Sequence, residues 1–84
     1  MSRPEVLKYR RREIIVPILA DKISKKKKTN EAIAEALMLP VDVLKLLLAG
    51  ECPITRIIAI RLAKVFARTN SKYWLDLEKE VNSL

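Results

Sequence analysis

The chain has 84 residues, half of them apolar, and a formal net charge of +7. This length allows one hydrophobic core but not two, and the apolar fraction excludes a disordered tail, so we expect a single domain over residues 1–84. The positive charge favours nucleic acid, an acidic protein surface or an anionic membrane as the partner, although a basic surface also serves solubility alone.

The first predicted helix follows Ser2, which stands three residues before Glu5 in the spacing of a capping box. Pro4 suits the first turn, where no amide donor is needed. One face of this helix is apolar and carries Leu7, Ile14 and Ile18. Because Pro17 lacks the amide proton that a continuing helix requires, the helix should end or kink just before it.

Residues 21–29, DKISKKKKT, show no helical stripe and predict a basic connector. Four consecutive lysines repel one another and stay solvated. Two interpretations remain open at this point: a disordered loop, or an arm that contacts phosphates.

Two short helices should follow the connector. The first is capped by Thr29 or Asn30, has Glu31 near its positive end, and buries a stripe of Ile33, Ala34 and Leu37. MLP, residues 38–40, breaks it, and VDVLKLLLAG, residues 41–50, forms the second helix with Gly50 as its stop. Two short helices joined by a tight turn of about three or four residues form a helix-turn-helix unit.

The second of these helices carries only two charged residues, Asp42 and Lys45, while its apolar residues point in every direction. A surface helix should have a continuous polar face. Either this helix is buried all round, or its outward face contacts another molecule. We expect Leu44, Leu47 and Leu48 in the core, and an outward apolar patch of Val43, Leu46 and Ala49.

Two more helices complete the predicted order of five. Thr55 caps the fourth, whose inward stripe is Ile58, Leu62, Val65 and Phe66 and whose separate basic face is Arg61, Lys64 and Arg68. Asn70 or Ser71 caps the last, in which Trp74, Leu77 and Val81 share one face and Asp76, Glu78 and Glu80 lie elsewhere. The pattern predicts an all-α domain without strands.

The residues needed for catalysis are missing. The chain has no histidine, no paired cysteines and no Gly-rich phosphate loop, and its acidic residues do not follow a calcium-loop pattern. We therefore expect no enzyme activity, no metal site and no cofactor. Cys52, alone, indicates a reducing, cytoplasmic location and is interpreted as a small apolar residue. No run reaches the ~18 apolar residues of a membrane span, and Arg10, Arg11 and Arg12 stand where a signal peptide would be apolar.

Residues 30–50, NEAIAEALMLPVDVLKLLLAG, and residues 54–81, ITRIIAIRLAKVFARTNSKYWLDLEKEV, resemble HigA-type antitoxins within the Xre/Cro-like helix-turn-helix family. The second stretch is the more specific, with RLAK from Arg61 to Lys64 and then Tyr73, Trp74, Leu75 and Leu77. RPEVL, residues 3–7, also resembles the start of this branch, whereas residues 8–29 match poorly. The resemblance implies a five-helix, lambda-repressor-like fold, with Ala34 as the small residue that faces the recognition helix.

Two features depart from this family's pattern. The turn usually has glycine where this chain has Met38, so Met38 must accept an uncommon positive φ or reshape the turn. The outward positions of the recognition helix, usually polar, map onto Asp42, Val43, Lys45, Leu46 and Ala49. Only Lys45 among them is a side chain suited to bidentate base readout, although Val43 and Ala49 could contact thymine methyl groups.

The sequence therefore predicts a DNA-binding transcriptional regulator, a HigA-like antitoxin and autorepressor. The resemblance implies a homodimer on double-stranded DNA and a RelE-like toxin as protein partner. Asp42, Val43, Lys45, Leu46 and Ala49 would face the bases, and the expected phosphate contacts are Lys25, Lys26, Lys27, Lys28 and Arg56, with Arg10 to Arg12 as further candidates. The alternative is a degenerate helix-turn-helix that acts as a protein-interaction module without specific DNA binding.

Overall fold

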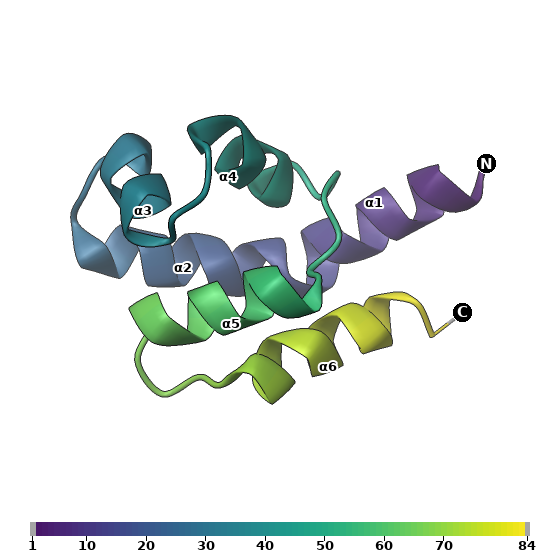
Figure 1. The fold of residues 1–84 in the computed structure, drawn as a ribbon. Coiled ribbons are helices and arrows are strands. Elements are labelled where there is room, and N and C mark those ends of the chain that lie inside the picture. The colour runs from purple at the N-terminus through teal and green to yellow at the C-terminus, as the bar shows by residue number, and fades with distance from the viewer. Residues whose placement is uncertain (1, 84) are drawn as a thin grey trace.

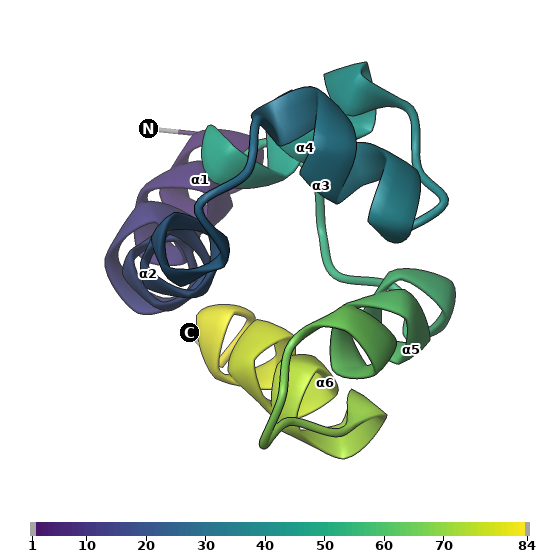
Figure 2. The ribbon, with the colours of Figure 1, turned by 90° about the vertical axis from the view of Figure 1, so that its left-hand side faces the viewer.

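The computed structural model describes residues 2–83, and this part of the chain contains six α-helices and no strand. The helices are α1 (Arg3–Ile14), α2 (Val16–Lys26), α3 (Asn30–Ala36), α4 (Val41–Leu48), α5 (Arg56–Val65) and α6 (Ser71–Val81). In Figure 1, α1 and α2 form a rod, with α3 and α4 above it and α5 and α6 below. Figure 2 looks nearly along this rod and shows the other helices arranged around a common centre. The all-α class is confirmed, whereas the expected number of five helices is wrong.

The rod from α1 to α2 is interrupted where the proline predicts it. Ser2 caps α1 by accepting the amide of Glu5 at 3.4 Å, as expected. α1 ends at Ile14, and Pro17 lies in the first turn of α2, where its missing amide proton matters least. Ile15 keeps near-helical angles, so the two helices continue in nearly the same direction (Figure 1).

The connector predicted over residues 21–29 is mostly helix, because α2 continues to Lys26. Ile15, Leu19 and Ile23 follow at intervals of four residues and are 2%, 0% and 8% exposed. Only Ile23 of this stripe falls inside the basic segment, so that segment alone shows no periodicity. Lys27 then ends α2 in the left-handed conformation, with φ of 53°.

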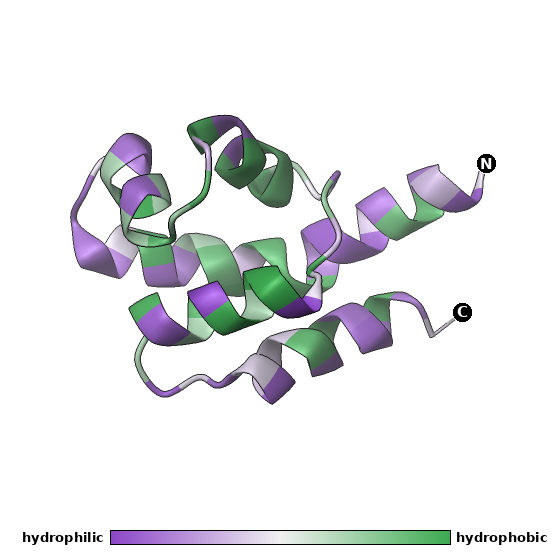
Figure 3. Cartoon of the chain, viewed as in Figure 1, coloured by the Kyte–Doolittle hydropathy of each residue, from purple (hydrophilic) through white to green (hydrophobic). Residues whose placement is uncertain are grey.

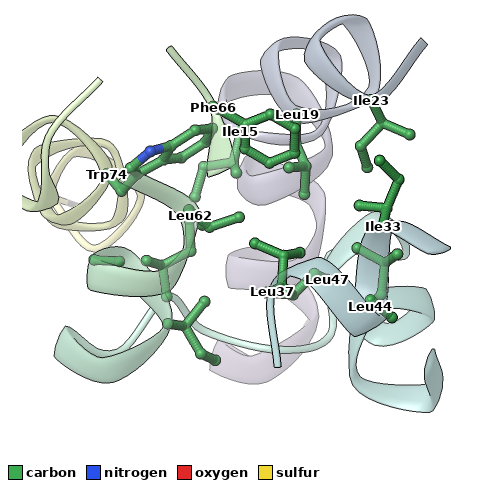
Figure 4. Close-up of a cluster of buried hydrophobic side chains, with 14 of the residues drawn as sticks. Ile15, Leu19, Ile23, Ile33, Leu37, Leu44, Leu47, Leu62, Phe66 and Trp74 are labelled. Carbon is green, nitrogen blue, oxygen red and sulfur yellow. The ribbon is translucent and has the colours of Figure 1, made fainter. Parts of the chain in front are cut away.

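One hydrophobic core joins all six helices. It extends from Trp74 and Phe66, whose ring centroids lie 6.2 Å apart, past Leu19 to Ile33 and Leu44 (Figure 4). Trp74 is fully buried, as its place on the apolar face of the last helix predicts. The expected stripes of the later helices are confirmed, with Leu48, Val65 and Leu77 only partly buried against the core. The face expected for the first helix is wrong, because Leu7, Ile14 and Ile18 are only partly buried and the rod buries Ile15, Leu19 and Ile23 instead.

Side chains cap the later helices as predicted. Thr29 accepts the amide of Ala32 at 3.1 Å, and Thr55 accepts that of Ile58 at 3.4 Å. Asn70, rather than Ser71, caps α6 by accepting the amide of Tyr73 at 2.8 Å. These bonds satisfy amide groups that have no partner inside the helix. No helix in the described part of the chain is long and apolar enough to cross a membrane.

Candidate nucleic-acid interface

The turn between α3 and α4 contains a residue in the left-handed backbone conformation. Met38 follows the end of α3 with φ of 58°, the uncommon conformation that the sequence required of a non-glycine residue here. Its amide donates to the carbonyl of Glu35, and that of Leu39 donates to the carbonyl of Ala34, each at 3.0 Å. These two bonds form a Schellman motif, which closes α3 and turns the chain toward α4.

The inner side of α4 holds the helix against the core. Leu44 and Leu47 are 0% and 3% exposed, as expected, while Leu48 is half-buried. Ala34 of α3 is also buried, at 2% exposed, at the position that the resemblance assigns to a small residue. Figure 3 shows α4 as the most continuously hydrophobic helix of the chain.

The outer side of α4 is narrower than predicted. Asp42 and Lys45 are exposed, and Leu46 is 43% exposed. Val43 is half-buried and packs against the core, and Ala49 is half-buried just beyond the last turn. The outward apolar patch expected of Val43, Leu46 and Ala49 is therefore reduced mainly to Leu46, because Val43 and Ala49 are each partly buried.

The end of α4 is fixed against α1. Gly50 has φ of 78°, and a Cβ atom there would lie 2.8 Å from the backbone oxygen of Lys8, so the position requires glycine. Arg12 donates to the carbonyl of Ala49 at 3.0 Å. Beside this contact, the ammonium group of Lys8, 2.9 Å from the Glu51 carboxylate, lowers the pKa of Glu51. The position of α4 thus depends on α1 as well as on α3.

The three consecutive arginines of α1 hold the fold together, which the sequence interpretation missed. Arg10 donates to the carbonyls of Val81 and Glu80 at 2.7 and 2.9 Å, at the end of α6. Arg11, 8% exposed, forms an ion pair with Glu78 at 2.9 Å. Arg12 donates from Nε to the carbonyl of Ala49, as described above, and its side chain stays exposed. The buried ion pair takes Arg11 out of the candidates for phosphate contact, whereas contacts from Arg10 and Arg12 stay a prediction.

Glu78 is buried at 9% exposed, whereas the sequence predicted it away from the core. Its carboxylate also accepts the amide of Ile54 at 3.1 Å and the side-chain amide of Asn82 at 2.8 Å. One acidic residue of α6 therefore links α1, α6 and the segment that leads from α4 into α5. The signal for this position was helical spacing, because Glu78 lies four residues after Trp74 and three before Val81 and so shares their buried face.

The lysine run is divided between different structures. Lys25 and Lys26 belong to the last turn of α2, Lys27 ends that helix, and Lys28 leads to the Thr29 cap of α3. Lys25 lies 3.1 Å from Asp21 in an exposed pair. The four side chains are exposed, and they are carried by a helix end rather than by a disordered arm.

The other predicted basic residues do not form one surface. Arg56 is exposed at the start of α5, and Lys64 lies near the end of the same helix. Arg68 lies beyond α5, with φ of 64°, so the expected basic face of Arg61, Lys64 and Arg68 is wrong. The helix ends three residues earlier than that face needs.

Phosphate contacts from Lys25 to Lys28 and from Arg56 would therefore come from two separate places. A hollow lined by Lys22, Lys25 and Lys26 also contains Phe66 and Ala67, which follow α5 directly. The lysines thus lie beside one end of α5 and Arg56 lies at the other. A helix of ten residues spans about 15 Å, which is comparable to the width of a DNA groove. No cluster of side chains suited to hold a metal ion is found among residues 2–83.

Comparison with known proteins gave no match: no family model, no curated protein and no solved structure resembles this chain at a significant level.

Proposed function

We propose that this protein is a DNA-binding regulator of the Xre/Cro-like type, a HigA-like antitoxin and autorepressor that acts in the cytoplasm. The observation that carries the proposal is the α3–turn–α4 unit, with Met38 in the left-handed position where the resembling family has glycine. Taken as one helix interrupted at Pro17, α1 and α2 would give the five-helix order of that family. The proposal thus rests on the geometry of the turn between α3 and α4 and on the sequence resemblance, which covers most of the chain.

In this proposal α4 enters the major groove, with its N-terminal end first. Asp42, Lys45 and Leu46 face the base edges, and Lys45 is the residue that donates hydrogen bonds to them. Val43 and Ala49 are half-buried, so only the exposed part of each side chain would contact the bases. Two copies on two half-sites would double this small set of contacts, so the proposal includes a homodimer on double-stranded DNA, and a RelE-like toxin as protein partner.

Phosphate contacts supply most of the affinity in this mechanism. Lys26, Lys27 and Lys28 are exposed next to the start of α3, and Arg56 is exposed at the start of α5. Each phosphate neutralised adds about −0.9 to the slope of log affinity against log salt. Replacing Lys25 to Lys28 by serine should therefore make the slope shallower by roughly two units or more. An unchanged slope would show that these lysines only solvate the end of α2.

The direct test is a titration with the DNA upstream of the protein's own gene and with a scrambled duplex of equal length. Lys45→Ala should weaken binding to the specific duplex by about 1–3 kcal/mol and leave the scrambled duplex nearly unaffected. Leu46→Ser is the matched control on the same helix, because it removes no hydrogen bond, and its effect should be small. Specific binding that survives Lys45→Ala undiminished would contradict the proposal.

A second candidate is favoured by the chemistry of α4. Its exposed side carries one hydrogen-bond donor side chain, Lys45, and a large apolar one, Leu46 at 43% exposure. Such a surface also suits a degenerate helix-turn-helix that binds protein instead of DNA. The same two variants separate the candidates, since a protein interface would be weakened by Leu46→Ser and hardly changed by Lys45→Ala.

A further inference from the structure

Three of the large apolar side chains exposed on the described surface gather between the α3–α4 turn and α5. Met38, Ile57 and Ile60 are 75%, 62% and 41% exposed. They line a hollow of about 300 Å³, together with Ala36, Leu37, Arg61 and Lys64. We name this surface the α5 groove. It is formed by the end of α3, by Met38 just after it and by the outer side of α5.

The core does not need these apolar side chains. α5 already buries Ile58, Ala59 and Leu62, at 8%, 0% and 0% exposure, on its inner face. Ile57 and Ile60 lie on the opposite side of the helix, where only a bound molecule would shield them from solvent. An exposed apolar cluster of this kind marks an interaction surface.

Met38 strengthens this conclusion, because its backbone conformation is unfavourable. A side chain at φ of 58° is strained relative to glycine, and packing inside the fold does not compensate for it, since the side chain is 75% exposed. The left-handed backbone closes α3, but that role does not require a large apolar side chain, so the exposed side chain itself needs another explanation. Methionine, flexible and polarizable, is also common at surfaces that bind varied apolar partners.

The charges around the groove define its partner. Arg61 and Lys64 form the rim, and none of the seven residues that line the groove is acidic. Arg61 also donates to the carbonyl of Met38 at 2.8 Å and so holds the turn beside α5. A partner that fits must bring apolar side chains to the floor and carboxylates to the rim.

We propose that the α5 groove binds an amphipathic helix of another protein, with apolar side chains against Met38, Ile57 and Ile60 and Asp or Glu side chains beside Arg61 and Lys64. Such a helix contacts a groove through the apolar side chains at positions i, i+3, i+4 and i+7, which share one face. This proposal does not depend on DNA binding by α4, because the groove residues lie outside the outward face of that helix.

The charges disfavour two other occupants. A second copy of the chain with its own groove in contact would bring a second pair of cations against Arg61 and Lys64, and the whole chain carries +7. The phosphates of a nucleic acid would pair with Arg61 and Lys64 on the rim. They would also lose water against the apolar floor of the groove without gaining hydrogen bonds there.

The test uses the full chain labelled with ¹⁵N and two synthetic helical peptides of roughly four turns, a length that spans α5. Both peptides carry leucine at i, i+3, i+4 and i+7, flanked by glutamate in one and by lysine in the other. The acidic peptide should shift the amide signals of residues 36–38 and 57–64 and saturate. The basic peptide should bind at least about tenfold more weakly. Equal binding of both peptides, or no saturable shift at these residues, would overturn the proposal.

Variants separate the groove from the fold. Met38→Gly removes the most exposed apolar side chain while relaxing its backbone, so affinity for the acidic peptide should fall about tenfold with no loss of thermal stability. Lys64→Glu should weaken the acidic peptide and strengthen the basic one. Leu46→Ser, an exposed apolar residue on α4, is the matched control and should bind like the unmodified chain. A Met38→Gly chain that keeps full affinity would contradict the assignment.

Two further measurements address the other occupants. Sedimentation should give the same oligomeric state for the unmodified chain and for Ile57→Ser. A dimer that Ile57→Ser dissociates would assign the groove to a second copy and overturn the proposal. A duplex oligonucleotide should leave the amides of residues 60–64 unshifted, because the proposed phosphate contact of Arg56 lies at the other end of α5, and a shift there equal to that caused by the peptide would overturn the proposal as well.

Discussion

The ion pair between Arg11 and Glu78 should contribute far more to stability than its length alone suggests. Its shortest contact is 2.9 Å, the same as that of the exposed pair between Lys72 and Asp76. The side chains of the first pair are 10% and 12% exposed, and those of the second are 82% and 57% exposed. Because water screens the second pair and not the first, the two provide a comparison at constant distance.

Glu78→Gln is the sharpest perturbation, because it preserves the shape of the side chain. One carboxylate oxygen accepts from Arg11 Nε and from the Ile54 amide, both at 3.1 Å. The other accepts from Arg11 Nη2 at 2.9 Å and from Asn82 Nδ2 at 2.8 Å. Since every partner is a donor, the NH₂ group of a glutamine must face one of them, and the guanidinium loses its counter-charge.

Removing one partner of a buried pair costs roughly 3–5 kcal/mol. A chain of 84 residues has a total stability on the order of 4–13 kcal/mol, so Glu78→Gln should remove a large part of it. Asp76→Asn, by contrast, should leave the stability nearly unchanged, because water and salt screen an exposed pair of this kind.

Urea unfolding followed by circular dichroism measures both variants. With a slope of about 1–2 kcal/mol per molar urea, Glu78→Gln should lower the midpoint by more than about 1.5 M, or prevent folding altogether. The double variant Arg11→Met/Glu78→Leu should lose less unfolding free energy than the two single variants lose together, because neither charge is then left buried alone. Equal midpoints for Glu78→Gln and Asp76→Asn would refute the argument from burial.

Four further predictions concern single positions. Met38→Gly should raise the melting temperature by a few degrees. Relief of the left-handed strain, about 1–2 kcal/mol, exceeds the cost of the entropy that glycine adds to the unfolded chain, about 0.5–1 kcal/mol. Gly50→Ala should lower the melting temperature, since the new Cβ would lie 2.8 Å from the Lys8 carbonyl oxygen. A Met38→Gly chain that melts earlier would show that the strain argument has the wrong sign. Trp74→Phe should cost clearly less than the roughly 3–5 kcal/mol of Trp74→Ala, because the buried indole nitrogen has no hydrogen-bond partner among the described residues, and equal losses in calorimetry would contradict this. Burial raises the pKa of the Cys52 thiol, so at pH 8 it should react with a disulfide reagent several-fold more slowly than in the urea-unfolded chain, and equal rates would exclude the shift.

The sequence by itself determined most of the local structure. Ser2, Thr29, Thr55 and Asn70 marked helix starts, and Pro17 marked a break, because each acts through backbone groups within four residues. The positive φ of Met38 was also readable, from its place in the turn. The buried stripes of the later helices followed from the helical period, since one face of a short helix must meet the core.

The tertiary structure decided which polar residues are free to act. The arginines of α1 looked like phosphate ligands in the sequence, yet their partners lie 37 to 73 residues away along the chain. Glu78 looked like a surface acid and instead accepts hydrogen bonds from α1 and from the segment before α5. A one-dimensional pattern records the charge of a side chain but not its partner. Charge pairing depends on distance in space, and this is why the basic residues expected at the candidate site divided into those that hold the fold and those that face solvent.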